Sequence, residues 1–132
     1  MIFDILNTEK GNVSINYSDI LFINVYAEIK HMRFYIKNDT DLMFDIGCNY
    51  IDYDILKHFT PIDNVSISCK YINLNSIKSV RIENTYIVIS HRKLPYGISY
   101  HDTDNTYFLR AVKLKNIENF LTDNQTIIEI IE

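Results

Sequence analysis

Short runs in which apolar and polar residues alternate occur along most of the chain, and polar turns separate them. A period of two is typical of β-strands that bury one face. The alternation is clearest at residues 65–70, where Val, Ile and Cys alternate with Ser, Ser and Lys, and residues 71–72 close the expected strand. Asn73, Asn75 and Ser76 then predict a polar turn, because Asn and Ser side chains bond to nearby backbone, and a new apolar run begins at Ile77.

Apolar runs at 13–17 and 20–23 predict two strands joined by a tight polar turn. The runs 32–36 with 42–46 and 79–82 with 86–90, each joined by polar residues, predict two hairpins. Residues 1–6 are expected to form a short strand or an ordered arm, and Gly47 is expected to interrupt the strand pattern. Residues 125–132 are rich in Ile and predict an added edge strand or a dimer contact.

Two segments have the spacing of short helices. Apolar residues at 51, 55, 56 and 59 follow Asn49, which is expected to cap the helix, and Thr60-Pro61 is expected to end it. Apolar residues spaced three and four apart predict a second helix at 114–121. The expected fold class is therefore mainly β, with antiparallel strands and two short helices.

Composition narrows the class of protein. With 132 residues, 47% hydrophobic and 23% charged, the chain is expected to form a single domain over 1–132. No apolar run approaches the roughly 18 residues that cross a bilayer, and no basic segment precedes the apolar N-terminus, so neither membrane contact nor export is expected. Cys48 and Cys69 lack paired His ligands at zinc spacing, and two cysteines suit a reduced, cytoplasmic protein better than a disulfide framework.

Catalytic motifs are absent from the sequence. It contains no G-x-S-x-G, Walker or H-E-x-x-H pattern, and three glycines are too few for a phosphate-binding loop. The chain is therefore not expected to be an enzyme. No cofactor, metal or small-molecule substrate is expected either.

The net charge of −4 is unevenly distributed along the chain. Residues 1–64 contain ten acids and five bases, 65–117 contain eight bases and three acids, and 118–132 contain four acids and no base. The middle segment predicts a basic face, which attracts phosphate even on an acidic protein. Chance clustering of the bases is the alternative.

Four stretches resemble the LytTR-type DNA-binding domain. They are residues 16–23, 73–77, 94–95 and 109–113. The sequence Asn-Leu-Asn-Ser-Ile at 73–77 resembles the most characteristic of the family's segments, in which Asn-Leu precedes an Ile that starts a strand. Ile67, Ser68 and Cys69 stand where the family has His, then Arg or Asn, then Ser. The resemblance covers about 13–121 and leaves 122–132 as a C-terminal extension.

The resemblance implies a largely β domain that presents loops, not a recognition helix, to the grooves of DNA. The positions that it assigns to base contact are His31, Ser68 and Arg110. Lys70, Lys113 and Lys115 are further candidates, for contact with phosphates. Arg110 is the strongest of these candidates, because a guanidinium pairs bidentately with guanine. The alternatives are an ordinary exposed His at position 31 and solvated surface charges at the basic positions.

Cys69 is a candidate redox-sensitive position. It lies beside Lys70 at the end of a strand, and a neighbouring cation lowers the pKa of a thiol. Burial as a small apolar residue is the alternative.

The function implied by the resemblance is that of a sequence-specific double-stranded DNA-binding transcriptional regulator without a receiver or sensor domain in the chain. The alternative is a protein-interaction module of the same fold that has lost DNA binding. Such a module would modulate a related regulator or self-associate, and a homodimer is compatible with either function. The acidic total charge and the replaced residues at 67–69 favour this alternative.

Overall fold

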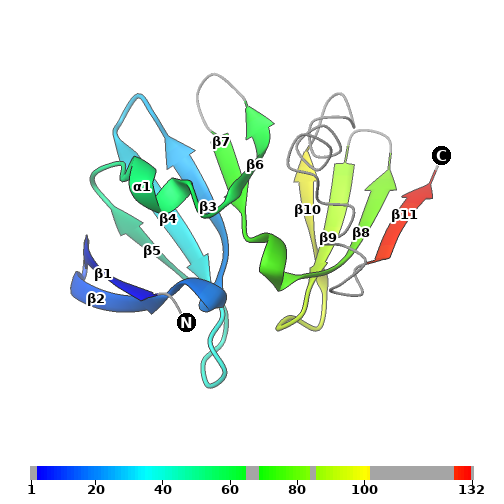
Figure 1. Ribbon diagram of the computed structural model, residues 1–132, viewed down its shortest axis with the longest axis horizontal. Helices are drawn as coiled ribbons and strands as arrows, with labels where there is room; N and C mark the ends of the chain where they lie inside the picture. The colour runs from blue at the N-terminus through cyan, green and yellow to red at the C-terminus, as the bar shows by residue number, and fades with distance from the viewer. Residues whose placement is uncertain (1–2, 65–68, 84–85, 102–126, 132) are drawn as a thin grey trace. The chain divides into compact units, whose positions relative to one another are not determined.

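Strands build both compact units of the chain, which are Met1–Ser76 and Ile77–Glu132. The computed structural model describes residues 3–64, 69–83, 86–101 and 127–131 (Figure 1). Within these ranges, no helix combines the length and the apolar character that crossing a bilayer requires. The expected mainly β class, with mostly antiparallel strands, is confirmed.

The first unit is built on an antiparallel five-stranded sheet with the strand order β5-β4-β3-β7-β6, and β1 and β2 form a separate hairpin. Its elements are β1 (Phe3–Thr8), β2 (Gly11–Asn16), the 3-10 turn η1 (Tyr17–Asp19), β3 (Ile20–Tyr26), β4 (His31–Ile36), β5 (Phe44–Cys48), α1 (Tyr53–Leu56), β6 (Thr60–Asn64), β7 (Cys69–Ile72) and the 3-10 turn η2 (Leu74–Ser76). The expected strands at 13–17 and 20–23 and the hairpin of 32–36 with 42–46 are confirmed as β2, β3 and the β4–β5 pair.

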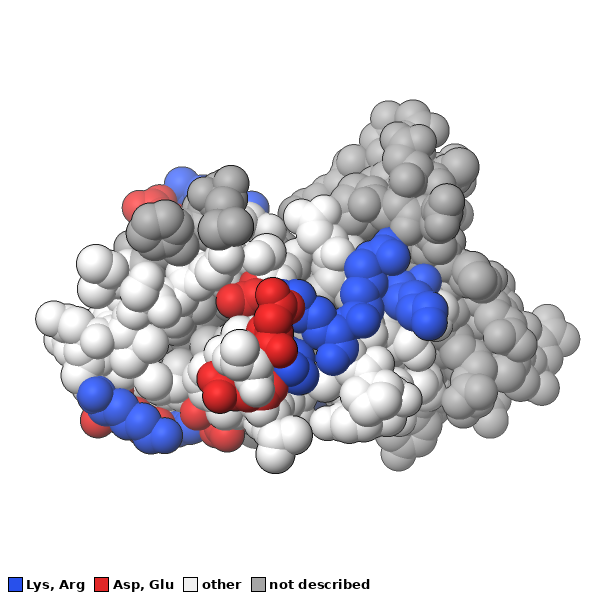
Figure 2. Space-filling model, turned by 90° about the horizontal axis from the view of Figure 1, so that it is seen from below, with Lys and Arg blue, Asp and Glu red and all other residues white. Residues whose placement is uncertain are grey.

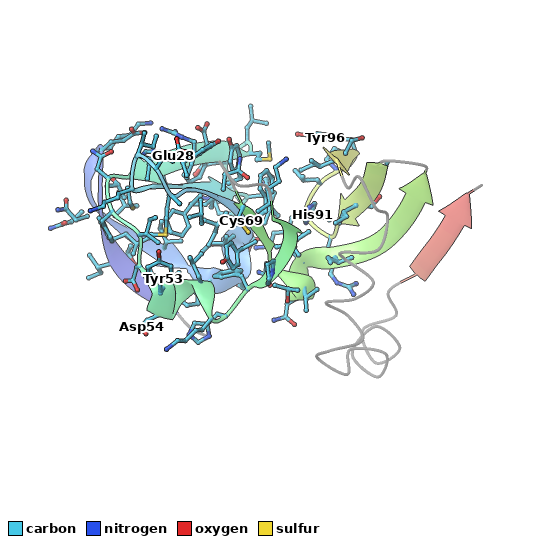
Figure 3. All side chains as sticks on the ribbon, turned by 90° about the horizontal axis from the view of Figure 1, so that it is seen from above. Glu28, Tyr53, Asp54, Cys69, His91 and Tyr96 are labelled. Atoms are coloured by element: carbon cyan, nitrogen blue, oxygen red, sulfur yellow. The ribbon has the colours of Figure 1, made fainter. Side chains whose placement is uncertain are left out.

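One face of the five-stranded sheet carries the core of the first unit. Along β4 the residues alternate between half-buried and buried, so that Met32, Phe34 and Ile36 all point to this face. The hairpin adds Leu6 and Ile15 to the same core, and α1 adds Ile55 and Leu56. In Figure 3, Glu28 on the β3–β4 turn and Tyr53 and Asp54 on α1 lie on opposite sides of this unit.

Three local expectations for the first unit are wrong. Gly47 lies inside β5 and does not interrupt it. A Cβ at this position would stand 2.6 Å from His31 Cε1, so the close approach of the His31 ring accounts for a glycine here. The helix cap is Asp52, not Asn49, since its side chain accepts from the backbone N–H groups of Asp54 and Ile55. The helix is also shorter than 51–59, and strand β6 follows it.

Thr60-Pro61 was expected to end the helix, and in the structure Pro61 is also part of strand β6. A proline lacks the N–H that a central strand must donate, but an edge strand tolerates it. Strand β6 is an edge of the five-stranded sheet and pairs with β7 alone among the described strands, with a register shift between Pro61 and Asp63.

The second unit contains a four-stranded sheet with the strand order β10-β9-β8-β11. Its strands are β8 (Ile77–Glu83), β9 (Tyr86–His91), β10 (Gly97–His101) and β11 (Ile127–Ile131). The hairpin of 79–82 with 86–90 is confirmed as β8 and β9. Residues 127–131 form the expected edge strand, but β11 pairs with β8 in parallel, unlike the other described pairs. The helix expected at 114–121 lies outside the described residues.

Asn73 joins the two 3-10 turns of the first unit. Its buried side-chain amide donates to the backbone oxygens of Tyr17 at 3.1 Å and Ile20 at 2.8 Å. Its backbone N–H donates to Leu21 O at 3.0 Å, and its Oδ1 accepts from the backbone N–H of Asn75 at 3.0 Å. One side chain therefore satisfies backbone groups at the start of β3 and in η2, far apart in the sequence.

Replacing Asn73 with Ala should lower the free energy of unfolding by about 3 kcal/mol, because buried carbonyl oxygens lose their donors. Replacing the exposed Asn75 with Ala removes no side-chain contact of this set and should change stability by about 0.5 kcal/mol or less. Urea unfolding of both variants measures the difference. Equal destabilisation of the two variants would show that the Asn73 amide has no special role.

His91 gives the second unit a pH dependence of stability. Burial, with no exposed surface left, lowers the pKa of its imidazole from 6.5 to about 4. The unfolded chain then binds the proton first, so the free energy of unfolding should fall as the pH drops from 6.5 towards 4, by up to about 3 kcal/mol. We expect His91→Gln to remove this component when unfolding is measured at about pH 7 and about pH 4.5. The same pH dependence in the variant would contradict the assignment.

Candidate nucleic-acid interface

The β3–β4 turn lies at the same end of the five-stranded sheet as the end of β6 and the start of β7. The register pairs Tyr26 with His31, Val25 with Cys69, and Asn64 with Cys69 (Figure 1). All four residues of the β3–β4 turn, 27–30, are exposed, and Ile29 keeps 71% of its surface accessible. This end of the sheet, together with the turn, is the candidate interface.

His31 is the first residue of β4, one residue before the start of the strand that the sequence pattern predicted at 32–36. Its half-buried ring lies against Gly47, and its Nδ1 is 3.2 Å from Asn49 Oδ1. A hydrogen bond to that oxygen requires the proton on Nδ1, which leaves Nε2 as an acceptor in the neutral ring. The absence of a side chain at Gly47 therefore makes the room in which the imidazole lies.

Arg33 lies on the same face of β4 as His31, but its charge is compensated. Its Nη1 donates to Asp45 Oδ2 at 2.7 Å, and its Nη2 lies 3.2 Å from Glu9 Oε1. The hydrogen bond to Asp45 is the main cause that raises the pKa of Arg33. Because Glu9 also donates its backbone N–H to Gly47 O at 2.9 Å, these contacts hold the β1–β2 turn against β5. Arg33 is therefore a structural residue of this corner.

Lys70 lies on the same face of the sheet as His31. It pairs with Asn24, whose neighbour two residues along β3 is Tyr26, the partner of His31. Directly opposed residues in an antiparallel pair have their side chains on one face. Since β4 and β7 flank β3, the backbones of His31 and Lys70 are two strand spacings, about 10 Å, apart across the sheet and two residues, about 7 Å, apart along it, which gives a separation of about 12 Å. Two predicted contact residues are thus brought together by the fold.

Cys69 points to the other face. It pairs with Val25, a core residue, and it is half-buried, within the sheet in Figure 3. Alternation along β7 therefore places Cys69 and Lys70 on opposite faces, although they are neighbours in the sequence. Redox sensitivity of Cys69 stays a prediction. Ser68, Arg110, Lys113 and Lys115 lie outside the described residues.

Aromatic residues also lie on the outer face of the five-stranded sheet, which is the face opposite the core and carries His31 and Lys70. They were not among the sequence-based candidates. The rings of Phe22 and Tyr35 stack with centroids 4.3 Å apart, and Asn24 Nδ2 donates to Tyr26 Oη at 3.4 Å. Burial raises the pKa of the Tyr35 hydroxyl above its ordinary value. Residues 22, 24 and 26 follow the period of two along β3, and this pattern in the sequence is the signal that could have placed them on one face. Lys70 lies on the same face because it pairs with Asn24.

A hollow of about 200 Å³ opens at the opposite end of the first unit. Its lining residues are Tyr17, Ser18, His58, Phe59, Asn73 and Asn75. The rings of Tyr17 and His58 meet edge to face, with centroids 5.2 Å apart. Because η1 and η2 lie where β3 begins and the candidate interface lies where β3 ends, the hollow and the interface are separate. In the described part of the chain no group of His, Cys, Asp and Glu is arranged to hold a metal ion.

Comparison with known proteins identifies the fold. No family model and no curated protein matches the sequence. A solved LytTr DNA-binding domain from Bacillus cereus is similar in structure, with a TM-score of 0.54 and 12% identity over 86% of this chain and 95% of that chain. A likeness at this identity shows the fold alone. The LytTR-like fold implied by residues 73–77 is therefore confirmed.

The two cysteines should differ in their reaction with a thiol reagent. Cys48 is fully buried in the first unit, and burial raises the pKa of its thiol, so it should react only when the protein unfolds. Cys69 is half-buried and should react faster than Cys48 in the native protein. Mass spectrometry measures the two labelling rates, with single Cys→Ser variants as controls. Slow, equal labelling of both thiols would remove the proposed redox role of Cys69.

Proposed function

We propose that this LytTR-like chain is a sequence-specific double-stranded DNA-binding regulator of transcription that contacts DNA through loops of its β scaffold. The observation that carries the proposal is the gathering of the β3–β4 turn, His31 and Lys70 at one end of a five-stranded sheet. The fold is similar to that of a domain described as DNA-binding, which supports the same conclusion.

The proposed contacts divide into two kinds. His31 would offer its ring Nε2 to a base edge as an acceptor while Nδ1 donates to Asn49, and Arg110 would pair bidentately with guanine. Lys70, Lys113 and Lys115 would bind phosphates, which position the protein without specifying a sequence. Strand pairing on both sides of β3 holds His31 and Lys70 in a fixed register, so the contacts on this sheet need little ordering on binding.

A protein-interaction module is the second candidate function. The first unit contains ten acids and six bases, an acidic balance that opposes approach to DNA. The exposed side chain of Ile29 on the β3–β4 turn would suit a protein partner, such as a related regulator or a second copy of the chain. In that case the same end of the sheet would bind protein and not DNA.

Titration of fluorescently labelled duplexes at low and moderate salt separates the two functions. Phosphate contacts release counterions, so the logarithm of affinity should fall linearly with the logarithm of salt concentration. AT-rich and mixed duplexes should also differ in affinity if base edges are contacted. No saturable binding to any duplex at about 50 mM salt would contradict DNA binding and favour the interaction module.

The single variants His31→Ala and Arg110→Ala should each weaken the binding free energy for a preferred site by about 1–3 kcal/mol, because a base contact is lost. Each should also discriminate less between sites. Replacing Lys113 should instead weaken all duplexes alike and lower the salt slope by about one unit. His58→Ala is the matched control, since this exposed His lies by the hollow at the opposite end of the first unit. Unchanged site preference in both test variants would show that neither residue contacts a base.

A further inference from the structure

An isoleucine lies in the β3–β4 turn, where small or polar residues are usual. Ile29 keeps 71% of its surface exposed, although turns favour Gly, Asn, Asp, Pro and Ser. An apolar side chain that stays in water contributes little to folding. The turn belongs to the candidate interface, and Ile29 stands two residues before His31 in the chain. Its position therefore points to a contact with another molecule.

Hydrogen bonding and backbone geometry fix the shape of the turn. Tyr26 pairs with His31 across its base, and Lys30 N–H donates to Ala27 O at 3.3 Å. Lys30 has a φ of 49°, in the left-handed region that favours glycine, and leads the chain back into β4. Ile29 itself is branched at Cβ, which restricts its χ1 angle. The Ile29 side chain is therefore presented from a defined backbone and needs little ordering on binding.

The surroundings of Ile29 suit a base edge better than a protein interface. Its neighbours Glu28 and Lys30 are charged and exposed, so Ile29 is the single large apolar side chain of the turn. A stable protein interface buries about 800 Å² on each partner around an apolar centre. One apolar side chain is enough, by contrast, to contact the C5-methyl group of thymine in the major groove of DNA. That groove is about 12 Å wide and admits two β-strands side by side, which is the width of this turn.

We propose that Ile29 is a specificity-determining residue that contacts the C5-methyl group of a thymine. This inference rests on the proposed function and adds an apolar base contact to the polar contact proposed for His31. Thymine alone among the four bases carries a methyl group in the major groove. The contact would therefore select a thymine at one position of the preferred site.

Leu42 provides a matched control at the opposite end of the first unit. It lies on the connection between β4 and β5, residues 37–43, and keeps 89% of its surface exposed. Figure 2 shows the protein from the side to which this connection points in Figure 1, and Asp and Glu side chains gather there alongside Lys and Arg side chains. Leu42 thus matches Ile29 in size and exposure without lying at the candidate interface.

The test uses the full chain and the duplex that it selects most tightly from a random pool. Each thymine of that duplex is replaced in turn by deoxyuridine, which removes only the C5-methyl group. At one position, wild-type protein should bind the uracil duplex about fourfold more weakly, the effect of one methyl-sized group leaving an apolar contact. Fluorescence anisotropy measures the ratio of the two affinities.

The variants assign that ratio to a side chain. Ile29→Ala should bind the uracil and thymine duplexes equally, because the partner of the methyl group is gone. Ile29→Val, which keeps a branched apolar side chain, should keep most of the wild-type ratio, and Leu42→Ala should keep all of it. Thermal melting reports whether each variant is folded.

The outcomes separate this inference from the proposed function. If wild-type protein binds duplexes but does not distinguish thymine from uracil, or if Ile29→Ala keeps the wild-type ratio, the methyl contact is refuted while DNA binding stands. Loss of the ratio in Leu42→Ala as well would also refute it. Loss of self-association in Ile29→Ala with an unchanged ratio would refute it and assign the turn to a protein contact. If wild-type protein binds no duplex, both the inference and the proposed function are wrong.

Discussion

The hydrogen bonds of Asn73 are the interaction on which the first unit depends. They join the backbone at the end of β7 to the carbonyl oxygens of Tyr17 and Ile20, where the chain enters β3. Strands β3 and β7 are neighbours in the sheet, so this junction helps to fix their register. A slip of one residue in this register would turn every side chain of the strand to the other face. By helping to fix the register, the Asn73 amide therefore influences which side chains face outward at the far end of the sheet.

The strand register determines which side chains lie on the outer face at the candidate interface. It places His31 and Lys70 on the outer face, turns Cys69 towards the core, and brings Arg33 beside two carboxylates. A basic residue in the sequence is thus not automatically a basic site. Arg33 instead holds the β1–β2 turn against β5 through its contacts with Glu9 and Asp45.

Periodicity in the sequence predicted most of the strands, because each buries one face and the period of two is a local property. It also identified the polar stretch at Asn73. The features that it missed depend on non-local packing. The His31 ring, distant in sequence, lies where a side chain at position 47 would stand, and Arg33 pairs with Glu9 across 24 residues. Asn49 and Asp52 are both good caps, but the helix begins at Tyr53, so Asp52, which precedes it directly, is the cap.

The central claim is that one end of the five-stranded sheet contacts DNA. The most direct measurement is the change of backbone amide NMR shifts when a short duplex that binds is added to isotope-labelled protein. The structure predicts the largest changes within the first unit at the β3–β4 turn, His31 and Lys70, with little change at α1. Changes confined to α1 and to the hollow beside Tyr17 and Asn75, with none at the β3–β4 turn, would contradict the claim.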